Sequence, residues 1–325
     1  MAQEELFLTM SVKPETVLIT GAAGFIGSRV AAHLLEAGFN VIGLERPGCD
    51  LFRVKRLLPR VKVYRLPGEK ASSVLRKEKI DGIIHLATYY RKRHAPADVG
   101  PMMRTNIEMP ALLLEAAVAA GVKWFINTGT FFECELPRRG PLKETAPIAP
   151  WNLYASTKTA FDGILKTYAA SGAMKAMTIR LFSPYGPNDN PDKVIPYLVS
   201  SLLRGDTVKL AGPLQKLSFI YVDDIADAYL KAAGKAGSLR KHETVNIGGG
   251  KSHDVLEVIR TLEAVSGGKL AFTLPPGKAR GPKPPVFADL RKARSLLGWR
   301  PRYDIRRGLK LTFDSCRNAA LSGRL

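Results

Sequence analysis

Tyr154 and Lys158 have the residue types and the spacing of an acid/base pair. They stand four positions apart in Asn-Leu-Tyr-Ala-Ser-Thr-Lys, so on a helix their side chains lie on one face. A free phenol has a pKa of about 10, and a neighbouring ammonium group favours its ionised form, which eases proton exchange at neutral pH. The pair is therefore a candidate proton donor and acceptor at a reacting oxygen; a packed tyrosine beside a surface lysine is the alternative.

A second candidate site is the glycine segment Gly21-Ala-Ala-Gly-Phe-Ile-Gly27, whose GxxGxxG spacing differs from the simple GxGxxG fingerprint. An apolar, β-branched stretch (16–20) precedes it and helical periodicity (29–37) follows it. Glycines let backbone amides approach a pyrophosphate, and the helix N-terminus behind them supplies partial positive charge. We therefore predict a dinucleotide site whose contacts are Gly21, Gly24, Phe25, Ile26 and Gly27.

Alternating apolar and helical segments predict the fold that positions these residues. Further strands are expected at 40–44, 61–64, 82–86, 124–128 and 176–181, and helices at 109–120 and 154–170. Parallel strands need crossover helices, so we expect an α/β fold with a doubly wound parallel sheet, the Rossmann architecture. Thr130 follows the fifth strand, at the sheet edge where such folds present functional groups.

Stretches rich in Pro and Gly at 183–191 and 274–285 indicate a second region. We expect a dinucleotide-binding domain over 1–182 and a smaller, mainly substrate-binding domain over 183–325, with 218–250 returning to the first domain.

The end of the second strand bears on cofactor choice. Glu45 there would bind the ribose hydroxyls of NAD, whereas Arg46 would accommodate the phosphate of NADP. Surface positions for both side chains are the alternative. The sequence is therefore compatible with either NADH or NADPH as the cofactor.

Composition and charge exclude several classes of protein. The chain has 325 residues, 46% hydrophobic and 24% charged, and lacks the roughly 20-residue apolar run of a membrane helix. The formal charge is +20, of which 17 units lie in 51–80 and 278–310, but few aromatic residues accompany them, so a nucleic-acid partner is not expected. Three cysteines, no basic leader and no histidine at metal-ligand spacing favour a cytoplasmic protein without a metal. We interpret the basic faces as solvated surface that attracts an acidic small molecule.

Several motifs occur along nearly the whole chain. They are GAAGFIG (21–27), HLA (85–87), Asn106, Thr130, Tyr154 with Lys158, RLFSPYGP (180–187), FIYVDDIADAY (219–229) and LGWRP (297–301). With these motifs the sequence resembles the extended short-chain dehydrogenase/reductases that act on nucleotide sugars. GIIHLATYY (82–90) and FINTGTFF (125–132) are most similar to ketoreductases of that family that make CDP-linked dideoxyhexoses such as abequose and paratose.

The resemblance implies roles for individual residues. Tyr154 would be the acid/base, Lys158 would bind the nicotinamide ribose and acidify the tyrosine, and Thr130 would hold the substrate oxygen. Further cofactor contacts would come from Leu86, Ala87 and Asn106. Substrate contacts are expected from Thr88, Thr130, Phe131, Ser183, Lys216 and Arg280, where Lys216 or Arg280 would replace the family arginine missing at Leu217.

The expected activity is NAD(P)H-dependent reduction of a nucleotide-activated 4-keto-6-deoxy sugar. A nucleotide-sugar 4-epimerase is the alternative, and an inactive RNA-binding or regulatory protein is the alternative of another class. Dehydration is disfavoured because Phe131 and Phe132 replace the Asp-Glu pair of the family's dehydratases. Small apolar residues on 109–120 and 154–170, together with the resemblance, predict a homodimer.

Overall fold

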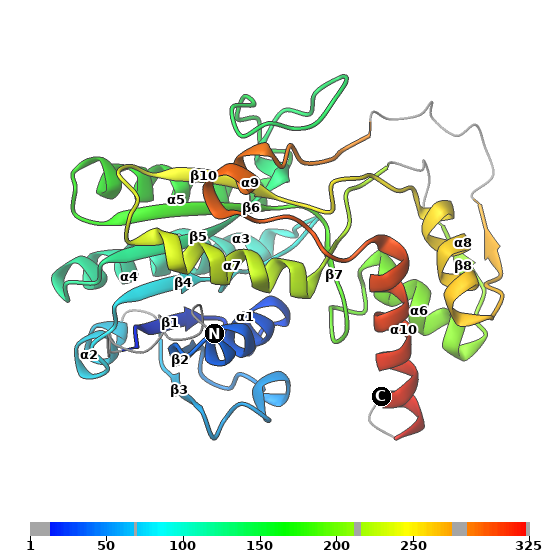
Figure 1. Cartoon of the computed structure of the whole chain (residues 1–325), viewed down its shortest axis with the longest axis horizontal. Helices are drawn as coiled ribbons and strands as arrows, with labels where there is room; N and C mark the ends of the chain where they lie inside the picture. Colours follow the sequence, from blue (N-terminus) through cyan, green and yellow to red (C-terminus); the bar gives the residue numbers. More distant parts are fainter. Residues whose placement is uncertain (1–13, 68–69, 211–215, 275–284, 323–325) are drawn as a thin grey trace, which may run out of the picture.

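A sheet of seven parallel strands forms the centre of the protein in the computed structural model, which describes residues 14–67, 70–210, 216–274 and 285–322 (Figure 1). The strand order is β10-β6-β5-β4-β1-β2-β3. The strands are β1 (Thr16–Thr20), β2 (Asn40–Glu45), β3 (Val61–Arg65), β4 (Gly82–His85), β5 (Trp124–Thr130), β6 (Lys175–Leu181) and β10 (Glu243–Ile247). The predicted α/β fold with a parallel sheet is thereby confirmed.

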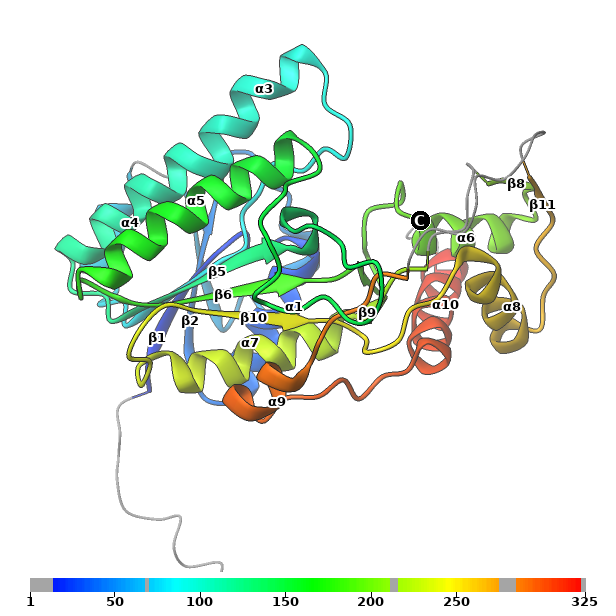
Figure 2. The same cartoon turned by 90° about the horizontal axis from the view of Figure 1, so that it is seen from above.

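Helices cover both faces of this sheet, which explains why its strands are apolar on both sides (Figure 2). In β1, Val17 and Ile19 pack into one buried cluster, whereas Leu18 points to the other. The helices on the first face are α1 (Phe25–Glu36), α7 (Val222–Ala236) and α9 (Arg291–Leu297). Those on the second are α3 (Pro96–Met103), α4 (Met109–Ala119) and α5 (Leu153–Ala170), together with α2 (Ala71–Lys77), which packs against α4.

The direction in which the chain winds reverses between β1 and β4, which are neighbours in the sheet. From β1 the chain passes outward to β2 and β3, and then crosses back to β4. Open α/β sheets bind ligands in the crevice that such a reversal leaves at the carboxyl ends of the strands. The glycine segment after β1 and the segment after β4 both lie at this crevice.

A smaller group of helices lies beside the carboxyl ends of the strands (Figure 1). It comprises α6 (Val194–Arg204), α8 (Val255–Ser266) and α10 (Ile305–Leu321), with two short parallel pairs, β7 (Pro184–Tyr185) with β9 (Ile220–Tyr221) and β8 (Val208–Lys209) with β11 (Phe272–Thr273). Between its parts the chain returns to the sheet, because α7 packs on one face and β10 pairs with β6. We propose residue 182 as the domain boundary, with α7 and β10 assigned to the dinucleotide-binding domain.

Several elements begin or end at residues that differ from the predicted bounds. Helix α1 starts at Phe25, inside the glycine segment, and β5 continues to Thr130. Helix α5 starts at Leu153 because the Asn152 side chain accepts a hydrogen bond from the Ala155 amide. A π-helical turn, Arg104–Glu108, joins α3 directly to α4. Residues 1–13, where the sequence shows no basic leader, lie outside the described residues.

Candidate active site

The glycine segment forms a close turn that leaves no room for a Cβ atom at Gly21 or Gly27. Gly21 has a φ of +74°, and a Cβ atom there would lie 3.0 Å from the Ala87 backbone nitrogen. A Cβ atom at Gly27 would lie 2.0 Å from the Gly21 carbonyl oxygen. Gly24 is the N-cap of α1 and offers no side chain to cap the first amides of the helix. The segment therefore presents uncapped amides and a helix N-terminus, which suits a diphosphate.

Glu45 is buried beside this segment, at the end of β2. One carboxylate oxygen accepts a hydrogen bond of 2.6 Å from the Ala23 amide, and the other accepts one of 3.4 Å from the Cys49 thiol. Burial raises the pKa of Glu45, and the Ala23 hydrogen bond opposes that rise. Arg46, the next residue, is exposed. The buried carboxylate is thus fixed to the glycine segment, whereas the guanidinium lies at the surface.

Asn106 joins the segment after β4 to helix α5. It is 1% exposed, and its Oδ1 accepts hydrogen bonds from the Tyr89 amide at 2.8 Å and the Thr88 hydroxyl at 3.1 Å. Its Nδ2 donates to the Tyr89 carbonyl and to the Thr157 hydroxyl, both at 3.0 Å. Asn106 lies in the π-helical turn, a feature frequent at functional sites. These four hydrogen bonds position the segment after β4 against α5. A direct contact between Asn106 and the cofactor stays a prediction.

The three candidate catalytic residues, Thr130, Tyr154 and Lys158, are all buried, and all belong to β5 or α5. Thr130 is the last residue of β5, and Tyr154 and Lys158 lie one turn apart near the start of α5. The Tyr90 ring packs edge-on against the Tyr154 ring, with centroids 4.9 Å apart. The Tyr90 ring thereby shields the Tyr154 side chain from water.

Electrostatics at the tyrosine differ from the sequence-based expectation. Burial raises the pKa of Tyr154, the charge of Glu133 raises it further, and a hydrogen bond with Thr88 lowers it. Burial lowers the pKa of Lys158, against the opposing charges of Glu133 and Asp162. In the protein alone, the tyrosine is therefore held as the neutral phenol.

Sequence reasoning missed a set of buried charges next to these residues. Glu133, Asp162 and Arg180 are each less than 10% exposed. Glu133 accepts a hydrogen bond from the Thr130 amide at 2.7 Å, and Arg180 Nε lies 3.7 Å from its other oxygen. A local signal existed, because Thr130-x-x-Glu133 has the spacing of a capping box, which the structure forms.

The remaining residues predicted to bind the substrate lie on several separate segments of the chain. Thr88 is exposed and next to the site, and Ser183 follows β6 with an unusual φ of 23°. Phe131 is 3% exposed and stacks on Phe182, with ring centroids 5.1 Å apart. Lys216 pairs with Glu257 and Asp254. Substrate contacts by these residues stay predictions, and Arg280 lies outside the described residues.

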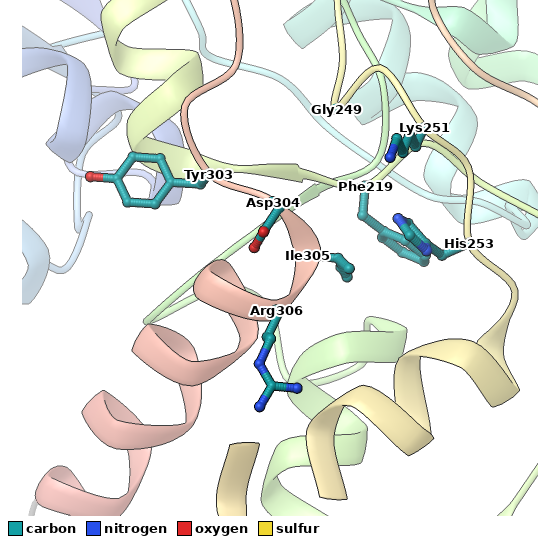
Figure 3. A pocket seen from close by; sticks show the side chains of 8 residues that line it. All are labelled: Phe219, Gly249, Lys251, His253, Tyr303, Asp304, Ile305 and Arg306. Carbon is teal, nitrogen blue, oxygen red and sulfur yellow. The ribbon is translucent and has the colours of Figure 1, made fainter. Parts of the chain in front are cut away.

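A separate cavity of about 230 Å³ lies between the start of α10 and the loop after β10 (Figure 3). Lys251 and His253 reach it from that loop, whereas Asp304 belongs to the start of α10. None of the candidate catalytic residues lines it. Its lining residues are Phe219, Gly249, Lys251, His253, Tyr303, Asp304, Ile305 and Arg306.

Within the described ranges, no three His, Cys, Asp or Glu side chains gather as a metal site would require. The same residues include no helix whose length and apolar character would let it cross a membrane.

Comparison with known proteins places the chain in a family. Residues 17–248 match the model of the NAD-dependent epimerase/dehydratase family, and the protein belongs to that family. The chain is 27% identical over 309 residues to a UDP-glucose 4-epimerase of Lacticaseibacillus casei, covering 89% of this chain and 92% of that protein. It is 28% identical over 248 residues to a CDP-abequose synthase of Salmonella muenchen, covering 76% and 79%.

A solved structure agrees with this assignment. The UDP-glucose 4-epimerase of Thermus thermophilus in complex with NAD superimposes with a TM-score of 0.82 at 26% identity, over 94% of this chain and 99% of the other. The expected nicotinamide cofactor is confirmed at the level of the family, as is the resemblance to enzymes that act on nucleotide sugars.

Proposed function

We propose that the protein transfers hydride between a nicotinamide cofactor and C4 of a nucleotide-linked hexose, and that its net reaction is the reduction of a 4-keto-6-deoxy sugar. The observation that carries the proposal is the burial of Thr130, Tyr154 and Lys158 at the strand ends, where the glycine segment also lies. The names of relatives, UDP-glucose 4-epimerase and CDP-abequose synthase, support the nucleotide-sugar class.

The cofactor fits the residues around the glycine segment. The uncapped amides in the first turn of α1, after Gly24, would hold its diphosphate, and the Glu45 carboxylate lies where ribose hydroxyls could donate to it. Because Glu45 is buried and fixed while Arg46 is exposed, we propose NADH in preference to NADPH. The bound nicotinamide supplies or removes the hydride, chemistry that protein side chains cannot perform.

Proton transfer is the task of the chain itself. Reduction of a ketone takes up one hydride at carbon and one proton at oxygen. Tyr154, kept neutral by burial, donates that proton, and the Thr130 hydroxyl donates a hydrogen bond to the developing alkoxide. The Lys158 ammonium then stabilises the phenolate that remains.

A 4-epimerase would use the same groups, first to oxidise C4 and then to reduce the ketone from its other face. The curated relatives named UDP-glucose 4-epimerase favour this second candidate. The two reactions differ in cofactor balance, because a reductase consumes NADH and an epimerase returns it.

One experiment separates them. Purified protein is incubated with a panel of nucleotide-linked 4-keto-6-deoxy sugars and NADH or NADPH, and separately with UDP-glucose and NAD⁺. We expect loss of nicotinamide absorbance with a 4-keto sugar. Formation of UDP-galactose without net NADH consumption would establish the epimerase. Inactivity on the whole panel, with salt-sensitive binding of labelled RNA, would support the regulatory alternative.

We further propose that two copies associate through α5 and the continuous helix formed by α3, the π-helical turn and α4, which runs beside α5 on one face of the sheet (Figure 2). Val99, Met103 and Leu112 expose 38%, 44% and 47% of their surface on α3 and α4. Exposed apolar side chains of this size favour a protein partner, and a twofold dimer lets the same surface of both copies bury them.

A further inference from the structure

Glu133 is a buried carboxyl group for which the proposed reaction assigns no role. Its side chain is 2% exposed, one oxygen accepts from the Thr130 amide at 2.7 Å, and the other lies 3.7 Å from Arg180 Nε. The preceding strand makes room for it, because a Cβ atom at Gly129 would lie 3.0 Å from Glu133 Oε1. A carboxyl group buried in this way has been removed from water at a large cost, so its surroundings must compensate for that cost.

Two cations and one further carboxylate face Glu133. Arg180 faces it from β6, and Lys158 and Asp162 face it from α5. Asp162 is already engaged by the Thr178 hydroxyl, by His242 and by Lys166. Glu133 is therefore the carboxylate available to balance the charges of Lys158 and Arg180. The Cys134 thiol, next in the chain, is also within its electrostatic reach.

The 3-10 turn Phe131–Glu133 packs against α5, the helix that carries Tyr154. Burial raises the pKa of Glu133 to about 7, so its carboxyl group is charged above that pH. The charge then acts on the proton donor. An anion near Tyr154 disfavours the phenolate and therefore raises the pKa of the tyrosine. Besides Glu133, the groups near Tyr154 include Tyr90, the Thr88 hydroxyl and Tyr229. Lys158 lies one turn further along α5. Glu133 is the carboxylate whose charge contributes to the raised pKa of Tyr154.

We propose that Glu133 is a positioning residue that holds the Thr130 main chain and balances the buried cations, and that its charge sets the pH range in which Tyr154 exchanges its proton. This inference rests on the proposed function of the same site, but it holds equally for a reductase and an epimerase.

The test compares Glu133→Gln with Glu135→Gln. The first variant keeps an oxygen that can accept from the Thr130 amide but removes the charge; the second removes a charge from an exposed neighbour. Reduction needs the protonated phenol and oxidation the phenolate, so each direction has a pH limb that reports on Tyr154. We expect both limbs to move to lower pH by roughly one unit in Glu133→Gln, and neither to move in Glu135→Gln. Unchanged limbs in Glu133→Gln overturn the proposal.

A second measurement does not depend on turnover. Tyrosine labelled with ¹³C at the ring carbon that bears oxygen is titrated by NMR in the NAD⁺ complex, and the Tyr154 signal is assigned with Tyr154→Phe. Its midpoint should fall in Glu133→Gln, and an unchanged midpoint overturns the proposal even if no substrate is found. Absence of turnover in the wild type would instead refute the proposed function.

The wild-type protein provides a further test in case Glu133→Gln does not fold. Interacting groups titrate together, so ionisation of Glu133 should add a smaller step to the Tyr154 curve. The step should persist in His242→Gln, which removes the nearby imidazole. A Tyr154 curve with one step only, or loss of the step in His242→Gln, contradicts the proposal.

Discussion

Replacement of Asn106 by alanine should weaken both the fold and the active site. The amide side chain makes four hydrogen bonds, two accepted and two donated, and is 1% exposed. A buried hydrogen bond contributes about 1 kcal/mol net, and orphaned partners cost more than that. Part of the segment at Thr88 is exposed and can be rehydrated. We therefore expect Asn106→Ala to lower the free energy of unfolding by about 2–4 kcal/mol.

Catalysis should suffer in the same variant, because the Asn106 network reaches Tyr154. Thr157, which accepts from Asn106, donates its hydroxyl proton to the Tyr154 carbonyl at 2.7 Å. The segment that Asn106 holds also carries Tyr90, which packs on the Tyr154 ring. Looser packing admits water to the phenol, so kcat should fall while the overall fold persists.

Urea unfolding followed by tryptophan fluorescence measures the loss of stability. Asn318→Ala is the matched control, because Asn318 is exposed on α10, and it should change stability by less than about 0.5 kcal/mol. A loss below about 1 kcal/mol in Asn106→Ala would show that water replaces these bonds without penalty, and the reasoning about the network would fail.

Four further outcomes are expected. Tyr154→Phe should abolish nearly all turnover but leave NADH affinity, measured by calorimetry, unchanged; substantial residual turnover would refute the acid/base role. Lys158→Met should weaken NADH binding and raise the pH optimum together, since one ammonium serves both tasks, and a change in only one would separate them. Burial raises the pKa of Glu45, so its carboxylate is lost as the pH falls through that raised value; NAD affinity should then decline toward acid pH, and much less so in Glu45→Gln. Leu112→Arg should convert a dimer to monomers in light scattering at micromolar concentration, whereas a wild-type monomer would refute the association.

The strands and the glycine turn could be predicted because their signals are local. Strand β1 is five buried residues bounded by polar or glycine positions, and the helix that follows ends near Gly38. Bounds were less predictable. Helix α1 begins at Phe25 because the turn at Gly21 already directs the chain into it, which an apolar pattern starting at Arg29 does not reveal.

No individual helix is predicted beyond Leu181, although the sequence there contains helix signals. Helix α8 starts with a capping box in which Asp254 accepts from the Glu257 amide and Glu257 accepts from the Asp254 amide. The return of α7 and β10 to the sheet, by contrast, has no local signal in the sequence. It depends on the pairing of β10 with β6, which brings together distant parts of the chain.

The active site likewise contains residues that local sequence reveals and residues that only the fold brings together. Tyr154 and Lys158 are recognisable because one helical turn joins them, whereas Glu133 and Arg180 meet only after β5 and β6 have paired. A charged residue in a sequence is expected at the surface, and only the pairing of strands shows that this one is enclosed with two cations. The identity of the acid/base is therefore encoded locally, but the pH at which it acts is determined by residues that the fold brings together.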